Sequence, residues 1–363
     1  GEKNMAAIEQ LACADVAGEN GFKWQTFKTL LQKCGYGDVE IAEEVGKKGV
    51  RMCGQIGPYP VLPPDFDSWK KKGVGALTKE GMSSFCDKQN ADTIKRSERA
   101  TPDPQHLEAM LKKLGDELKA GKMKEVDWDR LQASGDRVFR LVSERFGVEQ
   151  PDKVRPCDNM SGKKHGSKLN KLQWLCNKIV FQDLRHMTAL FEKFAGAGGE
   201  GANIWKIDQS DAYRFLLLDP EDLELLYIAL KGKVYQHLRV MFGSAASVTH
   251  YTRFSIALCT VILVYLLAPT CSFLDDFFGV TPKGERGLRW YKLVLRLHAA
   301  LGLPLGAHKC SPPTADVMVL GINAHVRRGV SLHYSAPPSK VRSALKIIEC
   351  SLRKSAISAE EAK

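Results

Sequence analysis

Two adjacent aspartates between two apolar segments constrain the fold of this chain more than any other feature. Asp275 and Asp276 follow the apolar residues 271–274 and precede residues 277–279, which predicts a β-hairpin with both acids at its turn. An ordinary hairpin turn uses Asn-Gly or Asp-Gly instead. Adjacent carboxylates beside a buried sheet repel each other and lose hydration, and a bound divalent cation offsets both costs. The turn is a candidate metal site, although an Asp-Asp pair alone is more often a solvated loop.

A third aspartate completes this candidate site. Residues 205–207 read as a short strand that ends at Asp208. If this strand pairs beside the 271–280 hairpin, the three acids meet at one sheet edge. Mg²⁺ prefers a few carboxylate oxygens together with water and substrate phosphates. Two Mg²⁺ ions, with Mn²⁺ as a substitute, would activate a hydroxyl nucleophile and stabilise a leaving pyrophosphate. We therefore assign Asp208, Asp275 and Asp276 as metal ligands and catalytic residues.

Composition narrows the class of partner. The chain has 363 residues, enough for two or three lobes, and a formal net charge of +11. A basic excess of this size favours an anionic partner, of which a nucleic-acid backbone and an anionic membrane surface are the usual examples. A basic surface that is merely solvated is the alternative. Among basic segments, residues 153–178 are dense in lysine and arginine.

The cellular location is predicted from sequence features that are missing. The ten cysteines form no C-x-x-C pair, which argues against a zinc ribbon and favours a reducing compartment. Residues 1–12 lack the pattern of a signal peptide. The apolar run 254–268 is shorter than the roughly 20 residues needed to span a bilayer, so a buried helix is predicted there. We expect an intracellular protein, in cytoplasm or nucleus, without a membrane partner.

Apolar spacing predicts an α+β fold in which strands and helices alternate after residue 200. The predicted helices are 24–34, 106–120, 126–145, 183–196, 220–230, 247–267, 285–301 and 339–352. The predicted strands are 204–208, 234–240, 316–322 and 328–333, in addition to the 271–280 hairpin.

From residue 153 to about residue 334 the sequence resembles the fingers and palm of reverse transcriptases, with the blocks of that family in order. The matching segments are Lys153 to Asp158 (fingers), Asp208 to Arg214 (motif A), Phe242 to Ser247 (motif B), Phe273 to Asp276 (motif C), Leu301 to Cys310 (motif D) and Val319 to Ile322 (motif E). Within that family, the sequence most resembles the enzymes of Ty3-like or DIRS-like retrotransposons. Phe273 departs from the usual tyrosine of motif C, and Pro312-Pro313 follow motif D closely.

The resemblance implies roles for further residues. Tyr213 becomes the gate that rejects a ribose 2′-hydroxyl, and Lys309 becomes a proton donor near the triphosphate. The implied dNTP-binding residues are Lys153, Arg155, Asp211, Ala212, Tyr213 and Gly243. The implied nucleic-acid contacts are Phe273, Leu320, Gly321, Arg253, Lys163 and Lys164.

The same resemblance implies a right-hand polymerase fold, with an antiparallel palm sheet packed on helices. It divides the chain into a mostly helical N-terminal extension of unknown role (1–130), fingers (131–203), palm (204–334) and the start of a thumb (335–363). The implied activity is RNA-directed DNA synthesis from an RNA template, a DNA or RNA primer and dNTPs. A degenerate palm that binds RNA or acts as a scaffold is the main alternative. An RNA-dependent RNA polymerase is a second one, which the bulk of Tyr213 disfavours. The oligomeric state is left open.

Overall fold

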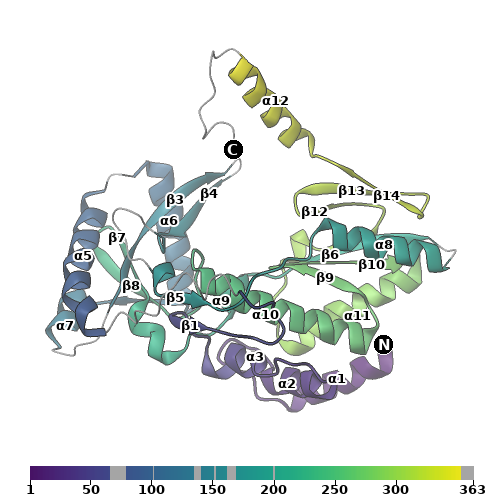
Figure 1. The fold of residues 1–363 in the computed structure, drawn as a ribbon, viewed down its shortest axis with the longest axis horizontal. Coiled ribbons are helices and arrows are strands. Elements are labelled where there is room, and N and C mark those ends of the chain that lie inside the picture. The colour runs from purple at the N-terminus through teal and green to yellow at the C-terminus, as the bar shows by residue number, and fades with distance from the viewer. Residues whose placement is uncertain are drawn as a thin grey trace.

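The chain folds into two lobes joined through helix α10 (Ala245–Val261), with a C-terminal helix that extends away from both (Figure 1). The computed structural model describes residues 1–65, 79–100, 102–134, 140–150, 153–161, 169–198 and 201–352. The predicted α+β class is confirmed, because helices pack on several separate sheets.

The first lobe is built on a four-stranded antiparallel sheet with the order β11-β6-β10-β9. Both faces of this sheet are covered, by α8 on one side and by α10 and α11 on the other (Figure 1). Because both faces are buried, β6 and β10 are apolar along most of their length instead of alternating. The elements are α8 (Leu184–Gly198), β6 (Ala202–Asp208), β9 (Thr270–Phe273), β10 (Asp276–Pro282), α11 (Glu285–Leu301) and β11 (Ser311–Thr314).

The first 62 residues complete the core of this lobe. Phe22 and Phe27 are fully buried, and both rings lie within 6 Å of the Phe254 ring on α10. Helix α1 packs along α11, as Figure 1 shows at the lower edge of the molecule. The elements are α1 (Glu2–Ala14), α2 (Trp24–Lys33), α3 (Ile41–Glu43) and the π-turn η1 (Glu44–Lys48). This segment is therefore part of the lobe and not a separate extension.

The second lobe is a five-stranded sheet with the order β2-β8-β7-β3-β4, flanked by helices α5 and α6. Its strands come from two distant parts of the chain, on both sides of the predicted boundaries at residues 131 and 204. The elements are α5 (Lys79–Arg99), α6 (Pro104–Lys119), β2 (Met123–Val126), α7 (Trp128–Ala133), β3 (Val142–Gln150), β4 (Lys153–Asp158), β7 (Tyr227–Leu230) and β8 (Lys233–His237). A short parallel pair, β1 (Gly54–Ile56) and β5 (Gln173–Leu175), lies between the lobes together with the 3₁₀ turn η2 (Leu169–Lys171).

Two predicted helices are wrong in this lobe. The predicted helix 220–230 is a 3₁₀ turn, η3 (Pro220–Leu225), followed by strand β7. The predicted helix 126–145 is the short α7 followed by strand β3. In both cases the residues near the end of the segment are fully buried between neighbouring strands, so pairing in the sheet overrides the local helical spacing.

The apolar helix of the first lobe is a core element. Residues 245–266, which comprise α10 and the π-turn η4 (Ile262–Leu266), are long and apolar enough to cross a membrane by composition alone. However, 72% of the apolar window is buried within the fold. This agrees with the buried helix predicted over residues 247–267.

The C-terminal part begins with a three-stranded antiparallel sheet above the first lobe (Figure 1). Leu320 and Gly321 form the turn between its first two strands, and both have a positive φ, 51° and 72°. Helix α12 then leaves the sheet and buries none of its residues. The elements are β12 (Asp316–Val319), β13 (Ile322–Arg327), β14 (Ser331–Ser335) and α12 (Pro338–Leu352).

Candidate active site

Strand pairing brings two of the three predicted catalytic acids face to face. Asp208 ends β6 and Asp276 begins β10, and the two residues are direct partners in the antiparallel ladder. The predicted pairing of the 204–208 strand beside the 271–280 hairpin is therefore confirmed. Asp208 is 6% exposed, so its carboxylate lies at the buried edge of the sheet.

Asp275 occupies the hairpin turn next to this pair. The preceding residue, Leu274, has a φ of 55°, and the Asp275 carbonyl accepts a hydrogen bond from the backbone N–H of Gln209 at 3.0 Å. The turn is thereby tied to the residue after Asp208. Burial raises the pKa of the Asp275 carboxyl, and the nearby charges of Asp276 and Asp208 raise it further. The three acids are thus close enough to interact electrostatically.

Each of the two opposed acids is paired with its own lysine. The Lys309 ammonium lies 3.0 Å from Asp208 Oδ2, and the Lys206 ammonium lies 2.8 Å from Asp276 Oδ1. Lys309 comes from η5 (Ala307–Lys309), and Lys206 lies two residues before Asp208 on β6. Lys309 was predicted from the sequence, but Lys206 was not. Lys206 lies on the same face of the strand as Asp208, because side chains alternate with period two.

The three acidic side chains are not arranged as the ligands of a metal ion. Within the described ranges, no group of three acidic, histidine or cysteine side chains is placed to hold a metal ion. The donor chemistry suits Mg²⁺, since all three side chains offer carboxylate oxygens. Asp208 and Asp276 are, however, directed to ammonium groups, so binding an ion requires these side chains to exchange partners.

A glycine makes room for the Asp208 carboxylate. A Cβ atom on Gly306 would lie 2.9 Å from Asp208 Oδ2, and the Gly306 N–H donates to the Asp208 carbonyl at 2.9 Å. The loop before Lys309 therefore approaches Asp208 more closely than any larger residue allows. Residues 302–306 contain two glycines, which is the signal by which this close approach could have been recognised.

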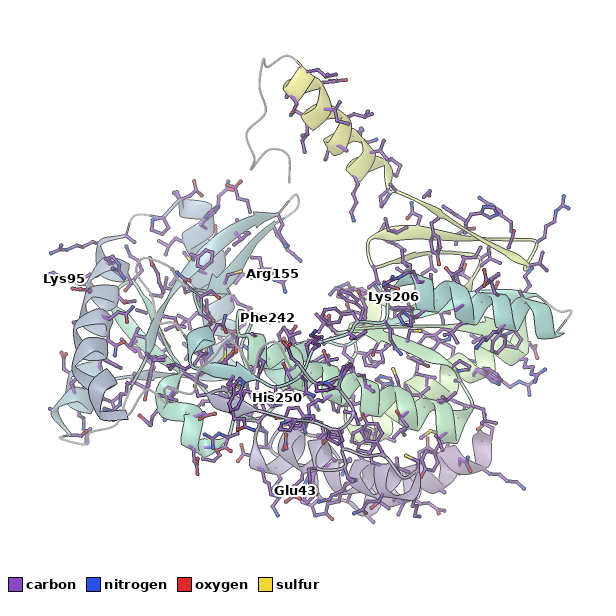
Figure 2. All side chains as sticks on the ribbon, in the orientation of Figure 1. Glu43, Lys95, Arg155, Lys206, Phe242 and His250 are labelled. Carbon is purple, nitrogen blue, oxygen red and sulfur yellow. The ribbon has the colours of Figure 1, made fainter. Side chains whose placement is uncertain are left out.

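A pocket of about 600 Å³ opens over the acids, between the two lobes. Figure 2 shows Arg155 projecting from β4 toward the first lobe, with Phe242 beneath it. The Arg155 guanidinium stacks over the Phe242 ring at 5.1 Å. The lining side chains include Asp208, Asp275 and Lys309 from the first lobe and Lys113, Lys153 and Arg155 from the second. The pocket therefore brings two of the three predicted acids, Asp208 and Asp275, together with the predicted basic residues.

Two of the residues predicted to bind the dNTP, Ala212 and Tyr213, differ in their access to this pocket. Ala212 lines it, whereas Tyr213 is 7% exposed and is not among the lining residues. The Tyr213 ring packs against Phe242 at 5.0 Å and against Tyr251 at 5.5 Å. Burial raises the pKa of Tyr213 to about 12, with a further contribution from Asp275. The ring is thus held in place by its two aromatic neighbours.

Asp211 and Gly243 are held by the second lobe. Asp211 has a φ of 59° and binds Lys122 at 2.5 Å. Burial alone would raise the pKa of Asp211, but the hydrogen bond from Lys122 and the charges of Lys122 and Lys113 lower it below its ordinary value. Gly243 has a φ of 91°, and a Cβ there would lie 2.7 Å from the Asp158 carbonyl, so only glycine fits.

A closed ring of buried charges underlies one wall of the pocket and was not predicted from the sequence. The ring runs Glu117, Arg145, Asp158, His237, Arg214 and back to Glu117. Burial and the charge of Arg214 lower the pKa of His237, so the ring contains two cations and two anions. Its five members come from α6, β3, β4, β8 and α9 (Ala212–Phe215). The ring therefore fixes the second lobe onto the segment that follows Asp208.

The predicted nucleic-acid contacts separate into three groups. Phe273 stacks with Phe181 at 4.5 Å beside the acid turn, and Leu320 and Gly321 form the β12–β13 turn. Lys163 and Lys164 lie outside the described residues. The prediction for Arg253 is wrong, because its side chain is 1% exposed and binds Asp38 and Glu44 inside the first lobe. Its charge compensates buried acids instead of facing solvent.

Comparison with solved structures shows what kind of fold holds this site. The foamy viral protease-reverse transcriptase, in its dRH form bound to double-stranded DNA, superposes with a TM-score of 0.55 over 72% of this chain, at 15% identity. The chain has a reverse transcriptase-like fold. The same foamy viral protein in another complex with double-stranded DNA gives a TM-score of 0.53 over 84% of this chain at 15% identity, and its RNA/DNA hybrid complex gives 0.50 over 81% at 14%.

The likeness is one of fold and covers part of the viral protein. The chain spans 39%, 60% and 38% of these three foamy viral chains. No family model matches the sequence, and no curated protein matches it either. The two lobes described above correspond to the fingers and palm region of the reverse transcriptase-like fold.

Proposed function

We propose that the chain is an RNA-directed DNA polymerase of a retroelement, which transfers nucleotides from dNTPs to a primer 3′-hydroxyl. One observation carries the proposal: Asp208, Asp275 and Asp276 meet at one sheet edge, and Asp208 and Asp275 line a pocket together with Lys153, Arg155 and Lys309. Acids beneath a basic pocket suit a reaction between a hydroxyl and a triphosphate. The reverse transcriptase-like fold, whose foamy viral examples were solved with DNA and with an RNA/DNA hybrid, supports nucleic acid as the partner.

The side chains have separable tasks in this proposal. Asp208, Asp275 and Asp276 would hold two Mg²⁺ ions, with Mn²⁺ as a substitute, and these ions would supply charge neutralisation at the primer hydroxyl and the phosphates. Arg155 suits phosphate oxygens because its planar fork can donate two hydrogen bonds at once. Stacking on Phe242 keeps that fork aimed at the pocket. Lys309, which lines the same pocket, would hold or deliver a proton close to the leaving phosphates.

Selection between dNTPs and ribonucleotides is proposed to rest on Tyr213. Its ring is packed between Phe242 and Tyr251, so it cannot move aside without disturbing both neighbours. A bulky fixed ring beside the sugar position excludes a 2′-hydroxyl, the group that distinguishes ribose from deoxyribose. This disfavours an RNA-dependent RNA polymerase.

A non-catalytic palm that binds RNA is the second candidate function. It is favoured by the ion pairs of Asp208 with Lys309 and of Asp276 with Lys206, which leave the acids directed to lysines. Such a protein would bind nucleic acid but would not extend a primer.

Primer extension on an RNA template separates the two functions. With Mg²⁺ and dNTPs, the wild type is expected to extend the primer, and Asp275→Asn is expected to lose at least a hundredfold in rate. Asp116→Asn, a change at an exposed position on α6, serves as the charge-matched control and should retain full activity. Equal extension by the wild type and Asp275→Asn would refute the catalytic assignment. Template binding without any extension by the wild type would instead support the second candidate.

A further inference from the structure

We propose that Lys113, on helix α6, is a triphosphate-binding residue of this site, in addition to the basic residues of β4 and η5. This inference rests on the proposed function and adds a substrate contact from a part of the chain to which the sequence assigned no role. Lys113 lines the same pocket as Asp208, Asp275 and Arg155, and its side chain is 40% exposed.

The position of Lys113 is fixed by the residue one turn further along α6. Glu117 is 3% exposed and binds both Arg145 and Arg214 in the buried ring. Residues four apart lie on the same face of a helix, so Lys113 and Glu117 both face the pocket. Because Glu117 is bound from two sides, the helix cannot rotate without breaking the ring. Lys113 is therefore held over the pocket by the fold.

The charge distribution leaves Lys113 available to an anion. Two ammonium groups share the single carboxylate of Asp211: Lys122 lies 2.5 Å from Oδ2, and Lys113 lies 4.0 Å from Oδ1. Lys122 already provides one full positive charge at hydrogen-bonding distance, so the positive charge of Lys113 is in excess. Exposed pairs at such a distance contribute little to stability. A triphosphate would draw Lys113 away from Asp211 at small cost.

Two other cationic side chains that line the pocket, Arg145 and Arg214, cannot bind a triphosphate in this way. Arg145 and Arg214 also line the pocket, but both are nearly fully buried and bind acids of the ring. Releasing either one would leave a buried carboxylate without its partner, which is strongly unfavourable. Among the residues that the structure describes, the cation that the second lobe can offer next to Asp211, apart from Lys122, is therefore Lys113.

Steady-state kinetics of single-nucleotide incorporation tests the inference. Lys113→Met keeps the apolar stem and removes the charge. It should raise the KM for dTTP about tenfold, since a hydrogen bond to a charged group is lost, while kcat stays within twofold. The same variant should raise the inhibition constant of inorganic tripolyphosphate to a similar extent, because the contact is to phosphate and not to the base. Lys113→Arg should restore much of the affinity.

Lys112→Met is the matched control. Lys112 is the neighbouring residue on α6 but is exposed and lies outside the pocket lining, so its KM for dTTP should match that of the wild type. Equal KM values for Lys113→Met and Lys112→Met would overturn the inference while the polymerase function stands. If the wild type does not extend primers, titration calorimetry with inorganic tripolyphosphate decides. Binding by the wild type that weakens tenfold in Lys113→Met supports the inference, and equal or absent binding overturns it.

Discussion

Asp208 and Asp276 face each other across the β6–β10 ladder, and a separate lysine neutralises each of them, Lys309 for the first and Lys206 for the second. Asp275, at the hairpin turn next to Asp276, has a pKa raised by burial and by the charges of the other two acids. The site thus resembles a metal site in which lysine ammonium groups occupy the positions of metal ions. This arrangement makes the lysines, as well as the acids, determinants of metal affinity.

Replacement of Lys206 tests this competition. Lys206→Met removes the ammonium that lies 2.8 Å from Asp276, so a divalent ion no longer has to displace it. Without metal the variant should be less stable than the wild type by about 1 kcal/mol, since a partly buried acid loses its partner. Mg²⁺ should then raise the melting temperature at a severalfold lower concentration than in the wild type. Lys283→Met, at an exposed residue just beyond β10, is the control, and an unchanged Mg²⁺ midpoint in Lys206→Met would contradict the idea.

Replacement of Tyr213 tests the gate. Tyr213→Ala opens the space beside the sugar, so incorporation of ribonucleotides relative to dNTPs should rise at least tenfold. The change also removes a buried ring that packs on Phe242 and Tyr251, and should cost roughly 3 kcal/mol in the free energy of unfolding. Tyr213→Phe keeps the ring and should keep the selectivity. A ratio of incorporation that is the same in Tyr213→Ala and the wild type would show that another residue selects the sugar.

Replacement of Arg253 separates a structural role from nucleic-acid binding. Arg253 binds Asp38 at 2.8 Å and Glu44 at 2.7 Å, and its guanidinium lies 3.4 Å from the centre of the Tyr59 ring. Arg253→Met leaves buried acids unpaired and should lower the free energy of unfolding by about 3–5 kcal/mol. Hydrogen exchange should increase first in η1 and in the segment around Asp38 that precedes α3, because Arg253 ties both to α10. If the variant is as stable as the wild type but binds the template more weakly, the nucleic-acid contact predicted from the sequence is supported.

Two buried histidines make the fold sensitive to acid. Burial lowers the pKa of His250 to about 3 and that of His298 to about 4, against about 6.5 in an unfolded chain. Below pH 6.5 the unfolded state therefore binds protons that the folded state cannot. Each histidine should cost about 2 kcal/mol of stability between pH 7.5 and pH 5. Urea unfolding across this range should show the loss as a fall in the free energy of unfolding with decreasing pH. His298→Gln should make this fall less steep. An equally steep fall in the variant would show that His298 is not the cause.

The sequence predicted the acid hairpin, its partner strand and the helix 285–301, because each has a strong local signal. Three signals can be recognised without tertiary information: the turn acids between apolar strands, the apolar strand that ends at Asp208, and the apolar helical stripe that stops at Gly302. These are the elements that carry the proposed chemistry.

What the sequence did not predict depends on partners distant in the chain. Strand β7 lies in a segment with helical spacing, and its strand state is decided by β3, some 85 residues earlier. Arg253 reads as a basic residue next to motif B, and only its burial and its ion pairs with Asp38 and Glu44 show that it is internal. Lys113 and the Glu117 ring were missed for the same reason, since residues of α6 meet the site only through the folded second lobe.

The docking of the N-terminal helices under α10 and α11 has a consequence for how the chain is made. Glu9 on α1 meets its partner Arg296 across a separation of 287 residues. At roughly 5–20 residues per second, a ribosome needs about 15–60 s to supply the second partner after the first. During that time the apolar side chains of α1 and α2 lack the surface that covers them. Such non-local closure slows folding, so this protein should depend on chaperones during synthesis more than a chain with local contacts does.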